Sequence, residues 1–228
     1  MMTRRKRVLL IITFCMFFTY IIYFTNHHNK INLMAIGDGI ASGETAFLID
    51  GISYNDYLKS YFISQKILNN YNNSYAYKNY KINDLVNDIK VNKLKDNDKL
   101  YINQLINQAD LITIGIGEEE LIKLVMTNDL DISYIKKTIQ EYDNLLYLIK
   151  ENTEANIVLV GFYENKYLDK SKVIILNSEL SNLANKYKVI FININDLLLN
   201  QELFSNNNSY YFNYKGHEQI AEMIIHSI

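Results

Sequence analysis

The chain has 228 residues, 49% of them apolar, and a formal net charge of −2 at pH 7. This apolar content excludes a disordered tail, and the length suits one α/β domain behind a short membrane segment. Four of the 23 Lys and Arg residues lie at positions 4–7, so the remainder of the chain is distinctly acidic. An acidic remainder lacks the basic face that nucleic-acid binding requires, and that class of function is excluded.

Residues 1–7 form a basic tail, and residues 8–24 (Val8 to Phe24) form an apolar run without a charged side chain. At about 17 residues, the run is at the short end of the range for a membrane-spanning helix. It is longer than the core of most signal peptides, and no A-x-A-like cleavage site follows it. We predict an uncleaved signal anchor, a single transmembrane helix in the cell membrane. The basic tail would lie in the cytoplasm and the C-terminal part would be extracytoplasmic.

Cys15 is the only cysteine, and it lies within the apolar run. Phe14 precedes it, where a lipoprotein signal needs a small residue, so lipid attachment is not expected. The outer part therefore has no cysteine with which to form a disulfide or a Cys-type metal site. Residues 25–30 are predicted to be a short polar linker, and residues 31–228 are predicted to form one domain.

From Ile31 onward, short apolar runs alternate with amphipathic stretches. A helical spacing of three and four is clearest in 132–150, where Asp131 is a candidate N-cap. The expected strands are 32–36, 75–80, 111–116, 157–162 and 189–194, and the expected helices are 54–68, 99–107, 119–126, 132–150, 173–186 and 215–228. This alternation predicts a parallel sheet with helices on both faces, in which ligands bind at the carboxyl ends of the strands.

The first predicted strand ends in Gly37-Asp38-Gly39-Ile40, and Gly43 follows. This turn resembles the opening block of the SGNH (GDSL-type) hydrolases, which reads Gly-Asp-Ser, an aliphatic residue and, further on, glycine. In that family the serine is the nucleophile, and its backbone N–H helps to form the oxyanion hole. Here Gly39 occupies the serine position. Taken alone, the turn is equally consistent with an ordinary glycine-rich connection between strand and helix.

The third predicted strand continues into Gly115-Ile116-Gly117-Glu118. This resembles the family's Gly-x-Asn-Asp block, in which the asparagine side chain donates to the oxyanion. Gly117 takes the place of the asparagine and Glu118 that of the aspartate. A carboxylate beside an oxyanion hole would repel the developing negative charge. Acidic residues here are also favoured in the first turn of a helix, which is the interpretation we prefer for 118–120.

Near the C-terminus, Asn213, Gly216 and His217 resemble the family's last block, Asp-x-x-His-Pro-Asn-x-x-Gly-His/Tyr. In this register the catalytic histidine falls on Tyr211 and the aspartate on Asn208. A tyrosine with an ordinary pKa of about 10 is a poor general base near neutral pH. Asparagine cannot carry the charge that stabilises an imidazolium. The resemblance therefore leaves none of the three triad positions intact. A weaker match at 80–85 places the family's oxyanion glycine near Asn79 or Tyr80.

The resemblance implies a three-layer α/β/α sandwich with a five-stranded parallel sheet, the flavodoxin-like SGNH hydrolase fold, preceded by one transmembrane helix. It implies an esterase or lipase ancestry. The substitutions at Gly39, Asn208 and Tyr211, with Gly39 and Gly117 at the oxyanion positions, predict a pseudoenzyme. We expect a binding or scaffolding module at the cell envelope, with an acylated glycan, a lipid or an envelope protein as its ligand, and no cofactor.

Two alternatives remain open at this point. Ser42 could replace the missing nucleophile with His217 as its base, which would make the chain an active esterase or acyl hydrolase. However, Ser42 is one position too late for a G-x-S-x-G elbow, and a serine there also suits a helix cap or turn. A hard cation bound by Asp38 and residues 118–120 is a weaker alternative, because acidic clusters near helix starts are common without a metal.

Aromatic residues gather near the predicted strand ends. Tyr54, Tyr210 and Phe212, together with Asp38 and Glu118, are expected to line the cleft. Such rings could hold a glycan or an acyl chain by stacking and apolar contact. Packing at the edge of the core is an equally good explanation in a chain with 19 tyrosines.

Overall fold

A computed structural model of the chain describes residues 13–17, 30–45, 47, 51–96, 98–121, 132–163, 170–205 and 211–228. The chain divides into two compact units, Met1–Lys30 and Ile31–Ile228. In the first unit, residues 13–17 are helical. The described residues include no helix long and apolar enough to cross a membrane. Most of the predicted anchor at 8–24 lies outside them, so the anchor stays a prediction.

The second unit is built on a five-stranded sheet in which every neighbouring pair is parallel. The strands are β1 (Ile31–Gly37), β2 (Leu68–Ala76), β3 (Leu111–Gly115), β4 (Asn156–Val160) and β5 (Ile190–Ile192). Their order, β2-β1-β3-β4-β5, is the flavodoxin-like one. The predicted five-stranded parallel sheet is confirmed. In this topology the direction of winding reverses between β1 and β3, and the crevice outside their carboxyl ends is where a ligand is expected.

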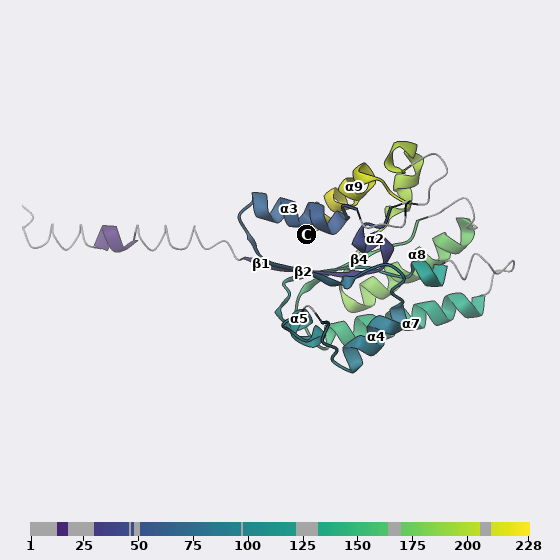
Figure 1. The fold of residues 1–228 in the computed structure, drawn as a ribbon, viewed down its shortest axis with the longest axis horizontal. Coiled ribbons are helices and arrows are strands. Elements are labelled where there is room, and N and C mark those ends of the chain that lie inside the picture. Colours follow the sequence, from purple (N-terminus) through teal and green to yellow (C-terminus); the bar gives the residue numbers. More distant parts are fainter. Residues whose placement is uncertain are drawn as a thin grey trace, which may run out of the picture. The chain divides into compact units, whose positions relative to one another are not determined.

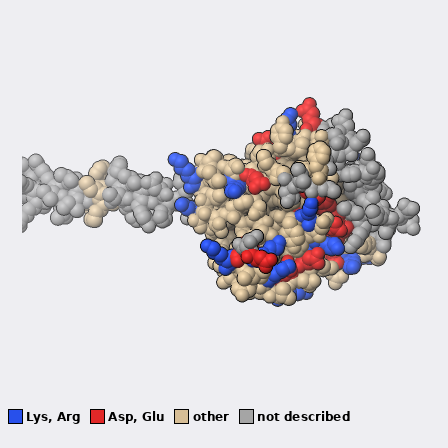
Figure 2. All heavy atoms as spheres, viewed as in Figure 1, with Lys and Arg blue, Asp and Glu red and all other residues tan. Residues whose placement is uncertain are grey.

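Helices cover both faces of the sheet (Figure 1). One face carries α2 (Gly39–Ser42), α3 (Tyr54–Ser64) and α9 (Tyr214–Ile225), and the other carries α4 (Ile82–Lys90), α5 (Ile102–Gln108), α7 (Ile132–Lys150) and α8 (Lys170–Tyr187). Two 3-10 segments, η1 (Ile194–Leu199) and η2 (Gln201–Leu203), follow β5. Lys and Arg side chains are interspersed with Asp and Glu on the surface seen in Figure 2.

The central strands supply two separate cores because successive side chains point to opposite faces. In β4, Ile157 and Leu159 pack under α7 and α8, whereas Val158 and Val160 pack under α3 and α9. All four are at most 2% exposed. This explains why the run reads as continuously apolar and not as an alternating pattern.

The second strand is where the sequence-based prediction is wrong. We expected a strand at 75–80, but β2 spans Leu68–Ala76, and residues 77–81 form a turn in which Asn79 has φ +61°. β2 pairs only with β1 and is an edge strand, so its first seven positions are partly or fully exposed, and most of them carry polar residues. The expected helix at 54–68 also ends early, at Ser64, because Lys66 takes a left-handed conformation with φ +59°.

Asn213 anchors the start of α9. Its Oδ1 accepts hydrogen bonds from the backbone N–H of Lys215 (2.9 Å) and Gly216 (3.2 Å). Its Nδ2 donates to the carbonyl oxygens of Glu202 (2.7 Å) and Phe204 (2.8 Å). The asparagine of the C-terminal block therefore both caps the last helix and fastens it to the segment before it.

Candidate active site

The carboxyl ends of β1 and β3 approach each other through two glycines. Gly37 has φ +149°, and a Cβ added there would lie 1.8 Å from the carbonyl oxygen of Gly115. The backbone N–H of Asp38 donates to that same oxygen at 2.9 Å. Any side chain at position 37 would force the strand ends apart, so glycine is required there by space as well as by conformation.

Asp38 joins the turns that follow these two strands. Its side chain is 1% exposed. One carboxylate oxygen accepts from the backbone N–H of Ile40 at 3.3 Å, and the other accepts from that of Glu118 at 2.7 Å. Burial raises the pKa of Asp38 well above its usual range, and the neighbouring carboxylate of Glu118 raises it further. Asp38 therefore holds together the two turns that correspond to the first two sequence blocks of the resemblance.

Gly39, at the family's nucleophile position, has no hydroxyl, and carboxylates fill the space beside it. A Cβ added at Gly39 would lie 2.6 Å from Oε2 of Glu118 and 2.6 Å from Oε2 of Glu44. Glu44 is buried and follows Gly43, whose φ of +82° ends α2. The direction that a serine side chain would take is therefore occupied by two acidic groups.

Glu118 is the first residue of the helical segment 118–121, as the preferred interpretation of its acidic run predicts. Burial raises the pKa of its carboxyl to about 7, and the carboxylates of Glu44 and Glu119 contribute to the rise. Two like charges that converge on one point cannot both be ionised cheaply, so the carboxyl of Glu118 is partly protonated near neutral pH.

The oxyanion position at Gly117 also lacks a side chain. Gly117 has φ +118°, and a Cβ there would meet the ring of Phe162 at 2.7 Å and the hydroxyl of Tyr142 at 2.8 Å. Tyr142 is fully buried and donates to the carbonyl oxygen of Ile116. The family's asparagine would therefore need both its backbone and two buried rings to move.

Two phenols complete the surroundings of the acidic pair. Burial raises the pKa of Tyr211, and the carboxylates of Glu118 and Glu44 raise it further. Tyr163, which follows β4, has a pKa raised well above its usual range, by burial and then by the same acidic neighbours and Asp38. The structure thus brings Tyr211, the residue at the histidine position, into the electrostatic neighbourhood of Gly39. Asn208 and Tyr210 lie outside the described residues.

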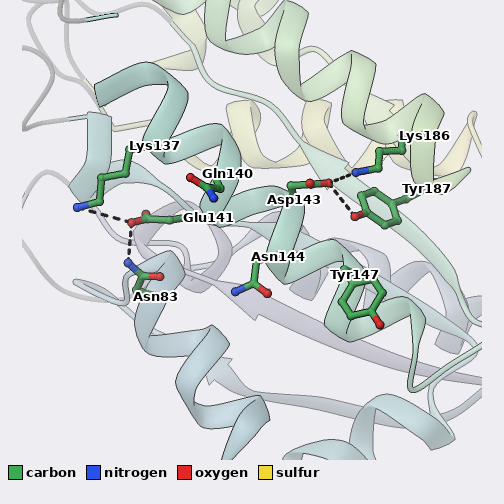
Figure 3. A pocket seen from close by; sticks show the side chains of 9 residues that line it. All are labelled: Asn83, Lys137, Gln140, Glu141, Asp143, Asn144, Tyr147, Lys186 and Tyr187. Atoms are coloured by element: carbon green, nitrogen blue, oxygen red, sulfur yellow. Dashed lines mark hydrogen bonds and ion pairs between the residues drawn. The ribbon is translucent and has the colours of Figure 1, made fainter. Parts of the chain in front are cut away.

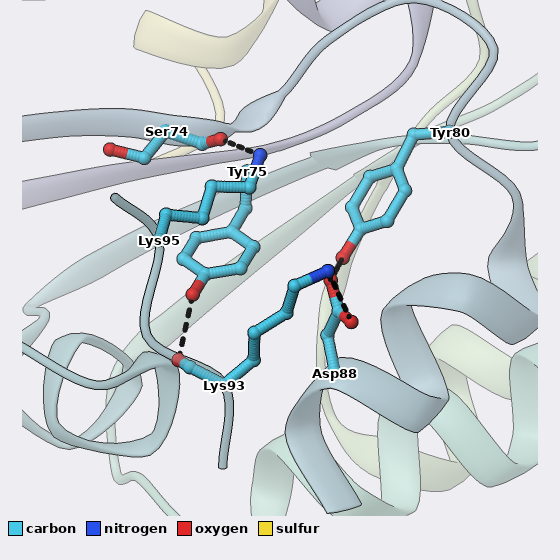
Figure 4. Close-up of polar contacts among 6 residues, drawn as sticks. All are labelled: Ser74, Tyr75, Tyr80, Asp88, Lys93 and Lys95. Carbon is cyan, nitrogen blue, oxygen red and sulfur yellow. Dashed lines mark hydrogen bonds and ion pairs between the residues drawn. The ribbon is translucent and has the colours of Figure 1, made fainter. Parts of the chain in front are cut away.

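The turn at 77–81, where the resemblance places an oxyanion glycine, is fixed by polar contacts (Figure 4). The buried hydroxyl of Tyr80 donates to Asp88 at 2.7 Å, and Lys93 forms an ion pair with the same carboxylate at 2.9 Å. The ammonium of Lys95 lies 3.5 Å from the ring centroid of Tyr77 and donates to the carbonyl oxygen of Ser74. These contacts give Tyr77 and Tyr80 a structural role.

Tyr54 and Phe212 do not line the cleft, which corrects that prediction. Tyr54 is fully buried and its ring stacks on that of His217, with centroids 6.4 Å apart. Phe212 is 2% exposed and stacks on Phe204, with centroids 4.8 Å apart. The ring of Tyr54 lies where α3 packs against α9, and that of Phe212 is packed just before α9, so both are buried and not available to a ligand.

The structure gives no hydrogen bond between the proposed substitutes. The hydroxyl of Ser42 donates to the carbonyl oxygen of Gly39 at 3.2 Å, as a turn-stabilising serine does. His217 is buried, and its Nδ1 has no hydrogen-bond partner among the described residues. Burial lowers the pKa of His217 to about 4, although Asp56 opposes the shift.

Within the described part of the chain, no three or more His, Cys, Asp or Glu side chains are arranged to hold a metal ion. The alternative of a cation bound by Asp38 and residues 118–120 therefore gains no support from the described residues.

Glu44 and Tyr163 are the site residues that sequence reasoning missed. Tyr163 stands just beyond the carboxyl end of β4, the kind of position in which site residues were sought, so its place after a strand was a usable signal. Glu44 had no such signal, because only the left-handed turn at Gly43 directs it back toward Gly39.

The raised pKa of Glu118 predicts an unusual pH dependence of stability. A carboxyl whose pKa is higher in the folded than in the unfolded chain contributes stability at low pH, and that contribution is lost as the pH rises through about 7. We expect Glu118→Gln to be more stable than the wild type by about 1–3 kcal/mol at pH 8. The two should converge below the ordinary glutamate pKa.

Urea unfolding of the full chain, followed by far-UV circular dichroism between pH 4 and pH 9, measures this difference. Glu179→Gln, which removes an exposed carboxylate on α8, serves as the control and should unfold like the wild type. A pH profile of Glu118→Gln that parallels the wild type throughout would show that the carboxyl of Glu118 is not held protonated.

Comparisons place this geometry among known folds. The sequence matches no family model and no curated protein. A protein described as a GDSL-like lipase from Parabacteroides merdae is similar in structure, with a TM-score of 0.64 and 16% identity over 87% of this chain and 96% of that one. An acetylxylan esterase from Geobacillus stearothermophilus has a TM-score of 0.64 and 16% identity, over 87% and 94% of the two chains. A family 3 carbohydrate esterase from Clostridium thermocellum has a TM-score of 0.60 and 13% identity, over 87% and 95%. Residues 31–228 therefore have the fold of the SGNH (GDSL-type) hydrolases.

Proposed function

We propose that this chain is a membrane-anchored, extracytoplasmic protein whose SGNH-type domain has no esterase activity and serves as a binding module at the cell envelope. One observation carries the proposal: at Gly39 a nucleophile is replaced by a bare backbone, and the carboxylates of Glu44 and Glu118 converge on the place of its side chain.

Ester cleavage by this fold needs a nucleophile, a base and donors to the oxyanion. Gly39 supplies no hydroxyl. Tyr211 is a poor base near neutral pH because it is not present as a phenolate. Burial and the nearby carboxylates raise its pKa and so stabilise the protonated phenol. Gly117 offers no side-chain amide, and negative charge on Glu118 would raise the energy of an oxyanion.

The same groups are suited to holding a neutral, hydroxyl-bearing ligand. A partly protonated Glu118 beside the carboxyl of Glu44 can both donate and accept hydrogen bonds, and the phenols of Tyr163 and Tyr211 can do the same. Two of the similar structures are esterases of acetylated or carbohydrate substrates by name. An acylated glycan is therefore the ligand class we propose, ahead of a lipid or an envelope protein.

An active esterase with Ser42 and His217 is the alternative. It would require the hydroxyl of Ser42 to leave the carbonyl of Gly39, and His217 to leave its place against the ring of Tyr54. It would also require His217 to accept a proton although burial has lowered its pKa to about 4. No observation on the described residues favours this alternative.

The absence of ester chemistry is directly testable. The full chain, purified in detergent, should hydrolyse p-nitrophenyl acetate and butyrate no faster than buffer does. Gly39→Ser should remain as inactive as its matched control Gly39→Ala, because the added side chain meets two carboxylates whose negative charge opposes an oxyanion, and Gly117 offers no side-chain donor to that oxyanion. Turnover by the wild type that disappears in Ser42→Ala would establish the rearranged esterase instead.

Ligand binding tests the second half of the proposal. An acetylated xylo-oligosaccharide should bind the full chain, and Tyr211→Ala should weaken binding by at least about tenfold because a donor beside the acidic pair is lost. Tyr61→Ala, at a tyrosine 37% exposed on α3, is the control and should bind normally. Equal affinity in Tyr211→Ala and wild type would contradict a site at the strand ends, and binding only to lipid vesicles would assign the lipid class.

The membrane anchor is tested by fractionation. The full chain should remain with the membrane after a carbonate wash, since a charge-free run of about 17 residues can span the bilayer. Replacing Leu10 and Ile21 by lysine should release it, because a charge in the hydrocarbon core is costly. Protease added to intact cells should digest the wild-type domain. Protection from that protease would contradict the proposed orientation.

A further inference from the structure

A concave surface lies along α7, on the face of the sheet opposite α3 and α9, and Figure 3 shows the side chains that line it. It is a groove of about 620 Å³ that runs along α7 between the start of α4 and the end of α8. It is lined by Asn83, Lys137, Gln140, Glu141, Asp143, Asn144, Tyr147, Lys186 and Tyr187. It shares no lining residue with the acidic pair at the strand ends. All of its side chains project from helices, which hold them more precisely than loops would.

Two carboxylates in the groove are held in place by partners. Asp143 accepts hydrogen bonds from Nζ of Lys186 at 2.6 Å and from the hydroxyl of Tyr187 at 2.7 Å. The hydrogen bond from Lys186 is the main reason that the pKa of Asp143 lies below its usual value. Glu141 accepts from Nδ2 of Asn83 at 2.6 Å, and Nζ of Lys137 lies 3.9 Å from the same oxygen. Both carboxylates are thus held in a fixed orientation and retain acceptor capacity.

Other polar groups in the groove are unused by the protein. The side-chain amides of Gln140 and Asn144 make no hydrogen bond to any described residue. Asn144 is half-buried, so its amide is already partly removed from water. The ring of Tyr147, one helical turn further along, is 50% exposed. The groove therefore presents free amide donors and acceptors next to an exposed aromatic surface.

The charge balance indicates what such a groove would bind. Two basic and two acidic side chains line it, and they form two ion pairs, Lys137 with Glu141 and Lys186 with Asp143. Neither an anion nor a cation gains a net attraction from this lining. A neutral ligand with many hydroxyls can both donate to the fixed carboxylates and exchange hydrogen bonds with the two amides. The apolar C–H faces of a sugar ring suit the exposed face of Tyr147.

The shape of the surface favours a chain of sugars over a single one. Asn83, Lys137 and Glu141 also line a second, smaller pocket of about 100 Å³, which extends to Glu120 and Tyr134. Because the two pockets share a wall, the concave surface continues from the end of α8 toward the turn after β3. We propose that this α7 groove is a binding site for a neutral oligosaccharide, separate from the ligand site at the strand ends.

The test is isothermal titration of the full chain with four probes: cellohexaose, xylohexaose, maltohexaose and chitohexaose. The detergent must have no sugar headgroup, since a maltoside would compete for the site. At least one probe should bind, and Tyr147→Ala and Asn144→Ala should each weaken that binding by about fivefold or more. Tyr147→Phe keeps the ring and should bind within about twofold of the wild type.

Two controls make the outcome decisive. Tyr61→Ala removes an exposed tyrosine from α3 on the opposite face and should leave the affinity unchanged. Tyr211→Ala alters the strand-end site, so a probe whose affinity falls in Tyr147→Ala but not in Tyr211→Ala is bound in the groove, and the opposite pattern would assign the probe to the strand-end site of the proposed function. The proposal is overturned if none of the four probes binds, if binding survives both groove variants, or if a sulfated hexasaccharide binds more tightly than every neutral one.

Discussion

The buried carboxylate of Asp38 is the interaction on which the site depends. It accepts one backbone hydrogen bond from the turn after β1 and another from the turn after β3. Since those two strands are neighbours at the point where the winding of the sheet reverses, Asp38 fixes the two turns that any ligand in the crevice must meet. Burying a charge is costly; these N–H donors offset part of the cost at Asp38, and the rest raises the pKa of its carboxyl.

The residues around Gly39 differ from a serine hydrolase site in charge as much as in residue identity. A serine hydrolase needs a site that stabilises developing negative charge. Here Glu44 and Glu118 converge beside Gly39, and the phenols of Tyr163 and Tyr211 sit in their field. Under the proposed function, the missing hydroxyl at Gly39 and the two carboxylates beside it would each oppose acyl transfer.

The sequence alone was sufficient to locate the strands that are covered by helices on both faces of the sheet. β3 and β4 are covered on both faces, so they read as apolar runs and were located to within two residues. β2 was misplaced because an edge strand with polar, exposed residues carries neither an apolar run nor a clean alternation. At the site, Gly39, Gly117 and Tyr211 were found through strand-end position and resemblance. Glu44 was missed because the left-handed turn at Gly43, and not a position at a strand end, brings it beside Gly39. Tyr54 and Phe212 were misassigned because helix packing decides whether an aromatic ring faces a cleft or a core.

Covalent labelling by a fluorophosphonate tests the central claim most directly, since this reagent forms a stable adduct only with an activated nucleophilic hydroxyl. The full chain should keep its unmodified mass after prolonged exposure at neutral pH, while an active serine esterase in the same tube is labelled completely. A stoichiometric adduct that peptide mapping assigns to Ser42, or to any other hydroxyl of the crevice, would contradict an inert site.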